Sequence, residues 1–326
     1  MEKRKNVRLF GSYLIFLACL SFFVDPASAA DYPKGPITLT ITFSQGGAAD
    51  TSARAIAAVM EAQLKVPVIC ENKLGGGGAV AFAWLARQKP DGYNIGITTV
   101  TLVLQQYTGI AGVKVSEFEP ISVIAYADNA LTVLANSPFK TLKDLVAYAK
   151  KNPRKVRVAN GASGGIWHLC AVALEEAAGV QFSHVPFKGG MEGAVAMLGG
   201  HVEASTSALG EVAEFATAGR ARILGLPSKE RISMFPDVPT FKEQGFDVDM
   251  GSFFGLIAPK GTPKEIIRTL DEASKKGTEA EKYRQIQSNF GNRTWYVNPD
   301  DFAKLIHAED ARYREIAVKL GLGKIK

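Results

Sequence analysis

The chain has 326 residues, of which 38 are Lys or Arg and 32 are Asp or Glu, so its formal net charge is +6. Opposite charges are interleaved and no basic cluster alternates with aromatic residues, which argues against a nucleic-acid groove. Its three cysteines are too few for a disulfide framework, and its four scattered histidines lack the spacing of a metal site.

The N-terminus has the pattern of a secretory signal peptide. Four basic residues precede the apolar run 9–24, and Pro26 closes it before the small residues 27–30. The run is shorter than the roughly 20 apolar residues that span a bilayer, which argues against a membrane anchor. We therefore expect cleavage near Ala29 or Ala30 and export to the periplasm, with lipidation at Cys19 as an alternative. Cleavage after Ala30 leaves 34 basic and 30 acidic residues, a net charge of +4.

Strands and helices alternate through the first part of the mature chain. Apolar runs predict strands at 37–43, 66–70, 93–98, 121–127 and 131–135, and helical periodicity predicts helices near 53–64 and 79–88. This alternation is typical of the α/β class.

The second part repeats the scheme. The predicted strands are 156–159, 182–186, 202–206, 223–226 and 253–257, separated by helices that begin near 141, 166 and 191 and by one that ends at Gly219. The segment Thr141 to Asp144 has a capping-box pattern, and Thr262 to Glu265 predicts an N-cap, a first-turn proline and a capping-box acid. A last helix starts at Asn298-Pro299 and is expected to end at Gly321.

The order of these elements predicts two lobes. Helices that follow a late return strand commonly pack back onto the first domain, so we expect a discontinuous domain, 31–129 plus 249–326. It would enclose a continuous domain, 130–248. Two hinge crossovers would then permit closure around a ligand in the cleft between the domains.

Two glycine-serine turns carry the strongest functional signal. Residues 44–47 follow the first predicted strand, 161–165 follow strand 156–159, and each turn opens a helix. Glycine allows close approach of the backbone, and a helix N-terminus leaves amide donors unpaired at the positive end of its dipole. The two turns are therefore predicted to hold one anionic ligand between them.

Other motifs have alternative interpretations. The run Gly75 to Gly78 lacks the spacing of a nucleotide site, so a tight turn is favoured and no cofactor is expected. Asp50 fits a helix cap better than a ligand contact. Lys188 is either a solvated lysine or a charge near the cleft, and Trp167 either belongs to the core or covers the ligand.

His168 and Ser163 raise a catalytic alternative. Their spacing fits the start of one helix, with no evident third member of a triad, so we expect His168 to line or cap the site. An exported hydrolase that uses both residues is the alternative, and a receptor that signals to a membrane sensor kinase is another.

At this point the chain resembles the Bug proteins, the TctC-like solute receptors of tripartite tricarboxylate transporters. The resemblance covers essentially the whole mature chain. Its motifs are Asp31-Tyr32-Pro33, Pro36-Ile37, Phe43 with Gly46-Gly47 and Asp50, Glu71-Asn72, Pro90-Asp91-Gly92-Tyr93, Phe118-Glu119-Pro120, Asn160-Gly161, His168-Leu169, Pro186-Phe187-Lys188-Gly189, Leu198-Gly199-Gly200, Pro236-Asp237-Val238-Pro239-Thr240 and Ala258-Pro259-Lys260-Gly261-Thr262-Pro263.

The resemblance implies a two-lobed periplasmic binding fold, not an enzyme, that closes on a small organic acid. The acid would be a di- or tricarboxylate or an aromatic acid, delivered to membrane permease subunits. The oligomeric state is left open, with a monomer as the default expectation. Carried across, the first carboxylate seat is Ser44, Gln45, Gly46, Gly47 and Ala48 with Asp50 nearby, and the second is Ala162, Ser163, Gly164 and Gly165 with His168. The predicted ligand-binding set adds Thr99, Trp167, Lys188 and Thr206.

Two departures from the family pattern concern the ligand. Where relatives usually carry an aspartate-rich strand end, this chain has 203–207, so hydroxyls such as that of Thr206 replace an acid at the cleft mouth and recognition of a ligand ammonium is not expected there. Gln45 and Trp167 stand where smaller residues are common, which favours a longer or aromatic carbon skeleton.

Overall fold

The computed structural model describes residues 32–108, 113–161 and 163–319. The chain from Pro33 onward forms one compact unit. The predicted signal peptide, Ala162 and the predicted helix end at Gly321 lie outside the described residues. Across the described ranges, no helix is both long and apolar enough to cross a membrane.

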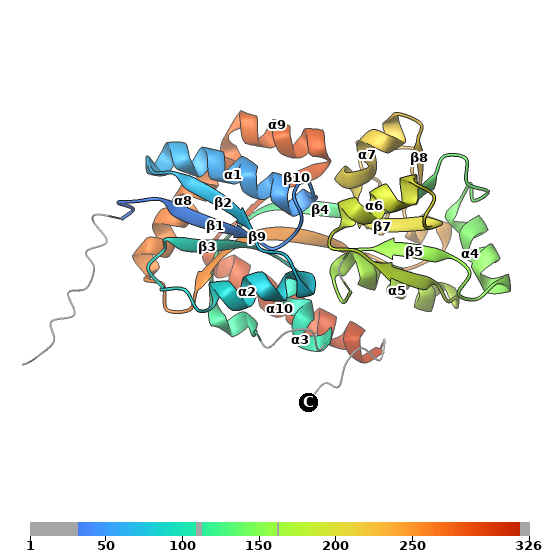
Figure 1. The fold of residues 1–326 in the computed structure, drawn as a ribbon, viewed down its shortest axis with the longest axis horizontal. Helices are drawn as coiled ribbons and strands as arrows, with labels where there is room; N and C mark the ends of the chain where they lie inside the picture. The colour runs from blue at the N-terminus through green and yellow to red at the C-terminus, as the bar shows by residue number, and fades with distance from the viewer. Residues whose placement is uncertain (1–31, 109–112, 162, 320–326) are drawn as a thin grey trace, which may run out of the picture. The chain divides into compact units, whose positions relative to one another are not determined.

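Two mixed sheets share one long strand, β4 (Figure 1). The order β2-β1-β3-β9-β4 continues as β4-β7-β5-β6, while β10 and β8 also pair with β4. The first sheet contains β1 (Ile37–Ile41), β2 (Val68–Asn72), β3 (Asn94–Thr99), β9 (Gly251–Pro259) and β10 (Asn292–Val297), with the first part of β4 (Phe118–Leu134). The second contains β5 (Arg157–Asn160), β6 (Ser183–Pro186), β7 (Ala204–Ala208) and β8 (Ala221–Gly225), with the rest of β4. We call each sheet with its helices a lobe.

The prediction of two separate strands at 121–127 and 131–135 is wrong, because β4 runs unbroken through both sheets. Asp128 and Asn129 lie between the two predicted strands, and each has a partner in the sheet. Asp128 accepts two hydrogen bonds of 2.9 Å from Arg293, and Asn129 lies in register with Ala208 of β7. The strand therefore passes from the first lobe to the second at these two polar residues.

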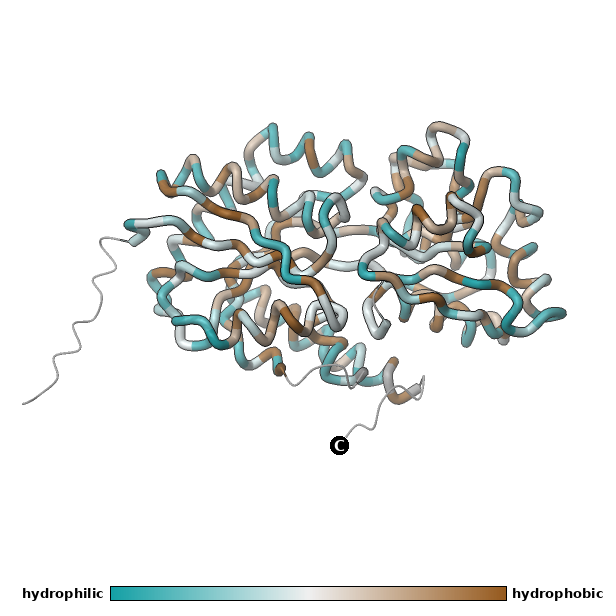
Figure 2. Tube along the Cα trace, in the orientation of Figure 1, coloured by the Kyte–Doolittle hydropathy of each residue, from teal (hydrophilic) through white to brown (hydrophobic). Residues whose placement is uncertain are grey.

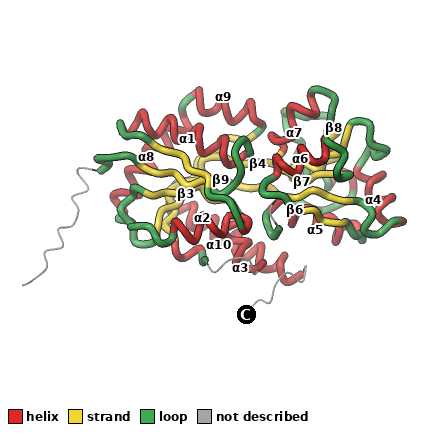
Figure 3. The backbone as a smooth tube through the Cα atoms, viewed as in Figure 1, coloured by secondary structure: helices red, strands yellow, loops and turns green. Residues whose placement is uncertain are grey.

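Helices cover both faces of each sheet (Figure 3). In the first lobe α1 (Ala48–Leu64), α8 (Lys264–Glu279) and α9 (Glu281–Phe290) pack together, and α2 (Ala79–Leu85), α3 (Thr101–Thr108) and α10 (Pro299–Lys319) lie opposite them. In the second lobe α6 (Gly190–Leu198) contacts α7 (Leu209–Thr217), and α4 (Leu142–Lys151) and α5 (Ile166–Ala178) complete the layer structure. The α/β prediction is confirmed, although α3, α9 and β10 were not anticipated.

The predicted helix starts have different outcomes. Thr141 caps α4 as expected, because its hydroxyl accepts the Asp144 N–H at 3.1 Å and the Asp144 carboxylate accepts the Thr141 N–H at 2.8 Å. The predicted cap of α8 is wrong, since the Thr262 hydroxyl instead donates to the carbonyl of Pro259 at 2.7 Å. Pro263 occupies the N-cap position of α8 without a side-chain cap.

The cores follow the apolar runs of the strands. In Figure 2 the brown, apolar stretches run along the strands and the helix segments that face them. Ile37, Leu39 and Ile41 of β1 are fully buried. Cys170 is a buried free cysteine, whereas the free Cys70 is half-buried because β2 is the edge strand of the first sheet.

The parallel pairing of the strands determines at which edge of each sheet the glycine turns lie. β1 is parallel to β2 and β3, and β5 is parallel to β6 and β7. Since the carboxyl ends of parallel strands share one edge of a sheet, the turns that leave β5 and β6 lie at the same edge of the second lobe. The turn that leaves β1 lies at the corresponding edge of the first lobe.

Candidate functional site

Three helix N-termini meet at one pocket. α1, α5 and α6 begin after the N-cap glycines Gly47, Gly165 and Gly189, and residues next to all three line the pocket. Each of these N-cap glycines has an extended backbone, and glycine has no side chain with which to cap the helix. Amides of the first turn have no partner within a helix, so the pocket wall presents N–H donors at the positive ends of three dipoles.

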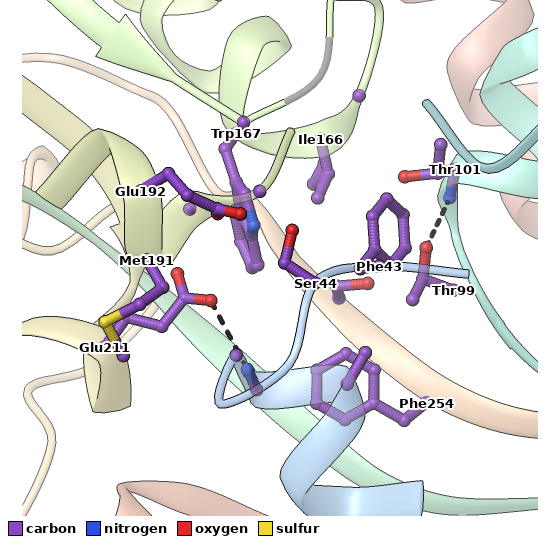
Figure 4. A pocket seen from close by; sticks show the side chains of 18 residues that line it. Phe43, Ser44, Thr99, Thr101, Ile166, Trp167, Met191, Glu192, Glu211 and Phe254 are labelled. Carbon is purple, nitrogen blue, oxygen red and sulfur yellow. Dashed lines mark hydrogen bonds between the residues drawn. The ribbon is translucent and has the colours of Figure 1, made fainter. Parts of the chain in front are cut away.

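The cavity of the pocket is small, with a volume of about 40 Å³. Both lobes contribute to its wall (Figure 4). The lining residues are Phe43, Ser44, Gly47, Ala48, Ala49, Thr99, Thr101, Gly161, Gly165, Ile166, Trp167, Gly189, Gly190, Met191, Glu192, Glu211, Ser252 and Phe254.

The structure brings together part of the predicted set. Six of the predicted residues line this pocket: Ser44, Gly47, Ala48, Thr99, Gly165 and Trp167. Ser163 and Lys188 line a second, neighbouring pocket that also contains Gly75 to Gly78. The remaining described ones, Gln45, Gly46, Asp50, Gly164, His168 and Thr206, line neither of these pockets. Gln45 and Gly46 are exposed.

Asp50 braces the first glycine turn. Its carboxylate accepts the Gly46 N–H at 3.0 Å, the guanidinium of Arg54 at 3.0 Å and the side-chain amide of Asn72 at 2.9 Å. Burial alone would raise the pKa of Asp50, but the hydrogen bonds from Arg54, Asn72 and Gly46 lower it below its usual value. With its oxygens used in this way, Asp50 shapes the turn.

His168 braces the second glycine turn. Its Nδ1 accepts the Gly164 N–H at 3.1 Å, so this nitrogen carries no proton and is not available as a base toward Ser163. Burial lowers the pKa of His168 to about 4, and the neighbouring His184, with its ring 4.7 Å away, adds to the effect. The neutral imidazole therefore acts on the backbone of the turn.

Thr206 supports the pocket from behind Trp167. Its hydroxyl donates to the Trp167 carbonyl at 2.8 Å and accepts from the Asn160 side-chain amide at 2.7 Å. Asn160 is the last residue of β5, so β7 and β5 jointly fix the start of α5.

A carboxylate from the second lobe occupies the N-terminus of α1. Glu211, in the first turn of α7, accepts the Ala48 N–H at 3.3 Å and the Ala208 N–H at 3.1 Å. The glycine at 190 makes this possible, because a Cβ there would lie 2.0 Å from Glu211 Oε2. Burial raises the pKa of Glu211 to about 7; the two amides lower it and the charge of Glu192 raises it further.

Sequence reasoning missed both carboxylates of the pocket. Glu192 lies in the first turn of α6 and Glu211 in that of α7, outside the segment 203–207 in which an acid was sought. The expectation of hydroxyls in place of an acid concerned segment 203–207 alone, and the acids of the pocket come from α6 and α7 instead. The glycine turn before α6 was a usable signal for Glu192. Glu211 lies at the capping-box position of α7, but Ala208 gives no capping signal at its N-cap.

Phe43, Ile166 and Phe254 were missed as well, and they make much of the wall apolar. No group of three or more His, Cys, Asp or Glu that could hold a metal ion occurs among residues 32–108, 113–161 and 163–319.

Comparison with protein families places the chain. The model described as "Tripartite tricarboxylate transporter family receptor" matches residues 52–322. A relative from Cupriavidus necator, described as "UPF0065 protein in gbd 5'region", is 35% identical over 315 residues, which cover 94% of each chain.

Solved structures agree on the fold. A TctC solute-binding protein from Polaromonas, determined with no ligand, is 34% identical with a TM-score of 0.68, covering 88% of this chain and 99% of that one. The R. palustris protein Rpa4515 with adipate is 27% identical with a TM-score of 0.85, covering 90% of this chain and 99% of that one. The fold is thus that of two-lobed periplasmic binding proteins, and these neighbours are solute-binding proteins, not enzymes.

Proposed function

We propose, because this chain belongs to the tripartite tricarboxylate transporter receptor family, that it binds a small carboxylate-bearing organic acid between its lobes. Proteins of this family are periplasmic solute receptors. The proposal places the acid in the pocket at the N-termini of α1, α5 and α6 and assigns no catalysis to Ser163 or His168.

The convergence of three helix N-termini, each with a glycine at its N-cap, at one pocket carries the proposal. An anion at a helix N-terminus accepts hydrogen bonds from free amides and interacts favourably with the dipole. The Ala48 amide of α1 already binds Glu211, so the first turns of α5 and α6 are the positions that we assign to a ligand carboxylate. Charge-assisted hydrogen bonds contribute about 1.5–3 kcal/mol each, so a few are sufficient for roughly micromolar binding.

A related structure supports the ligand class. Rpa4515, at 27% identity, was solved with adipate, a linear dicarboxylate. The pocket here offers Phe43, Trp167 and Phe254 to an apolar skeleton, which fits a longer-chain or aromatic acid.

The wider role follows from the family. The receptor would be exported by its N-terminal signal, act as a monomer and deliver the acid to the permease subunits of a tripartite transporter. Domains 31–129 plus 249–326 and 130–248 would close on the ligand through their two crossovers.

Calorimetry with purified protein tests the proposal. Mass spectrometry of small molecules released from fresh protein would identify a co-purified acid, and titration of mono- and dicarboxylates should then give saturable heat. The variant Gly165→Val places a bulky side chain in the pocket wall and should abolish the heat of binding. The variant Gly35→Val should retain it, because residue 35 has open space around it. Absence of both heat and co-purified acid would contradict the proposal.

A further inference from the structure

Two carboxylates line a pocket that is expected to take an anion. Glu192 and Glu211 both border it, and the described part of its lining contains no Lys, Arg or His. Lys188 borders the neighbouring pocket instead. A ligand that carried only negative charge would therefore meet the carboxylate of Glu192 and the acidic side chain of Glu211 in a partly buried site, which is unfavourable.

Two polar atoms of this wall have no partner. Within the described chain, neither Ser44 Oγ nor Glu192 Oε2 makes a hydrogen bond, although both atoms are buried. Ser44 itself is only 7% exposed. A buried polar atom without a hydrogen-bond partner is unfavourable, and both a carboxylate oxygen and a hydroxyl oxygen can accept from a donor group of a ligand.

Gly189 and Gly190 bring these acceptors to one side of the pocket. A Cβ at residue 189 would lie 2.9 Å from Glu192 Oε2 and 3.4 Å from Ser44 Oγ, and one at residue 190 would lie 2.0 Å from Glu211 Oε2. Figure 4 shows Glu192 and Glu211 on one side, with Phe43 and Phe254 on the other and Ser44 between. The indole of Trp167 also borders this space.

We propose that Glu192, Glu211 and Ser44 form a subsite for a cationic hydrogen-bond donor, so that the ligand is an amino carboxylate. This inference rests on the proposed function, because the ligand's carboxylate would occupy the amides at the start of α5. Its ammonium would donate to Glu192 Oε2 and Ser44 Oγ and balance the charge of Glu192. Glu192 thus selects zwitterions over simple acids.

Matched pairs of compounds test the subsite. Each amino carboxylate is titrated beside the acid that lacks only its amine: 6-aminohexanoate with hexanoate, leucine with 4-methylpentanoate, and 4-(aminomethyl)benzoate with 4-methylbenzoate. Adipate is the dicarboxylate reference. In at least one pair we expect the amino compound to bind the wild-type protein at least tenfold more tightly than its partner and than adipate.

Variants then assign the effect. The variant Glu192→Gln should lose most of the preference for the amino compound and should still bind the plain acid. The variant Ser44→Ala should lose a smaller part of this preference. Glu214→Gln, an exposed glutamate on α7, is the matched control and should leave the preference unchanged. The thermal midpoint of each variant verifies that it is folded.

The outcomes separate the two proposals. If plain acids or adipate bind as tightly as the amino compounds, or if Glu192→Gln keeps the preference in a folded protein, the subsite is rejected and the carboxylate receptor stands. If no compound of either kind binds and none co-purifies, both proposals are rejected.

Discussion

The N-termini of α1 and α5 look alike in sequence and differ in what they hold. Both follow a strand, both have a glycine N-cap with extended backbone, and neither has a side-chain cap from that residue. At α1 the Ala48 amide is bound by Glu211 of the other lobe, whereas the turn before α5 is held from outside the pocket by His168. The same local sequence pattern therefore precedes two different N-termini: that of α1 binds a carboxylate of the protein itself, and that of α5 is the one that we assign to the ligand.

The largest expected effect concerns the charge of Glu211. Its pKa is about 7 in the folded protein, above the ordinary 4.5, so between these values the native state holds a proton that the unfolded chain releases. Its contribution to the free energy of unfolding is then fully present below pH 4.5 and is lost as the pH rises through 7. The shift corresponds to about 3 kcal/mol.

Urea unfolding from pH 4.5 to 8 measures this contribution. The stability of the wild-type protein should fall relative to that of Glu211→Gln as the pH rises, and Glu214→Gln should follow the wild type. Because His168 titrates with the opposite sign, only the difference between variants is informative. Parallel profiles for wild type and Glu211→Gln would show that Glu211 is not buried at the α1 N-terminus.

A smaller effect is expected at Gly190. A Cβ at this position would meet Glu211 Oε2 at 2.0 Å and Ser207 Cβ at 3.0 Å, so Gly190→Ala should displace the carboxylate from the Ala48 amide. Overpacking of this kind lowers stability by about 1–3 kcal/mol. Urea unfolding checks it, with Gly35→Ala as the control because residue 35 has open space around it. Equal stability of both variants would refute the close contact.

The smallest effect is expected at the turn before α5. His168→Ala removes the acceptor of the Gly164 N–H and should lower stability by about 1 kcal/mol, the typical contribution of one hydrogen bond. Amide hydrogen exchange at Gly164 should become faster, while the exposed His307→Ala should change neither quantity. Unchanged exchange at Gly164 would mean that His168 does not hold the turn.

The sequence by itself determined the local chemistry. Apolar runs predicted most strands to within a few residues, and Thr141 predicted the start of α4. The two glycine-serine turns predicted the N-termini of α1 and α5. These signals succeed because they depend on neighbours within one turn or one strand. Asp50 and His168 lie within a few residues of the turns that they brace. Because these contacts are local, the sequence was sufficient to predict a capping role for both side chains.

Only the tertiary structure decided what meets across the cleft. Glu211 lies 163 residues from Ala48, and no spacing in the sequence reveals that its carboxylate reaches the α1 amide. The passage of β4 between the sheets likewise depends on Arg293, which lies 165 residues after Asp128. Burial, charge balance and pairing at such distances are properties of the folded chain, because they are set by which surfaces pack together rather than by local preference.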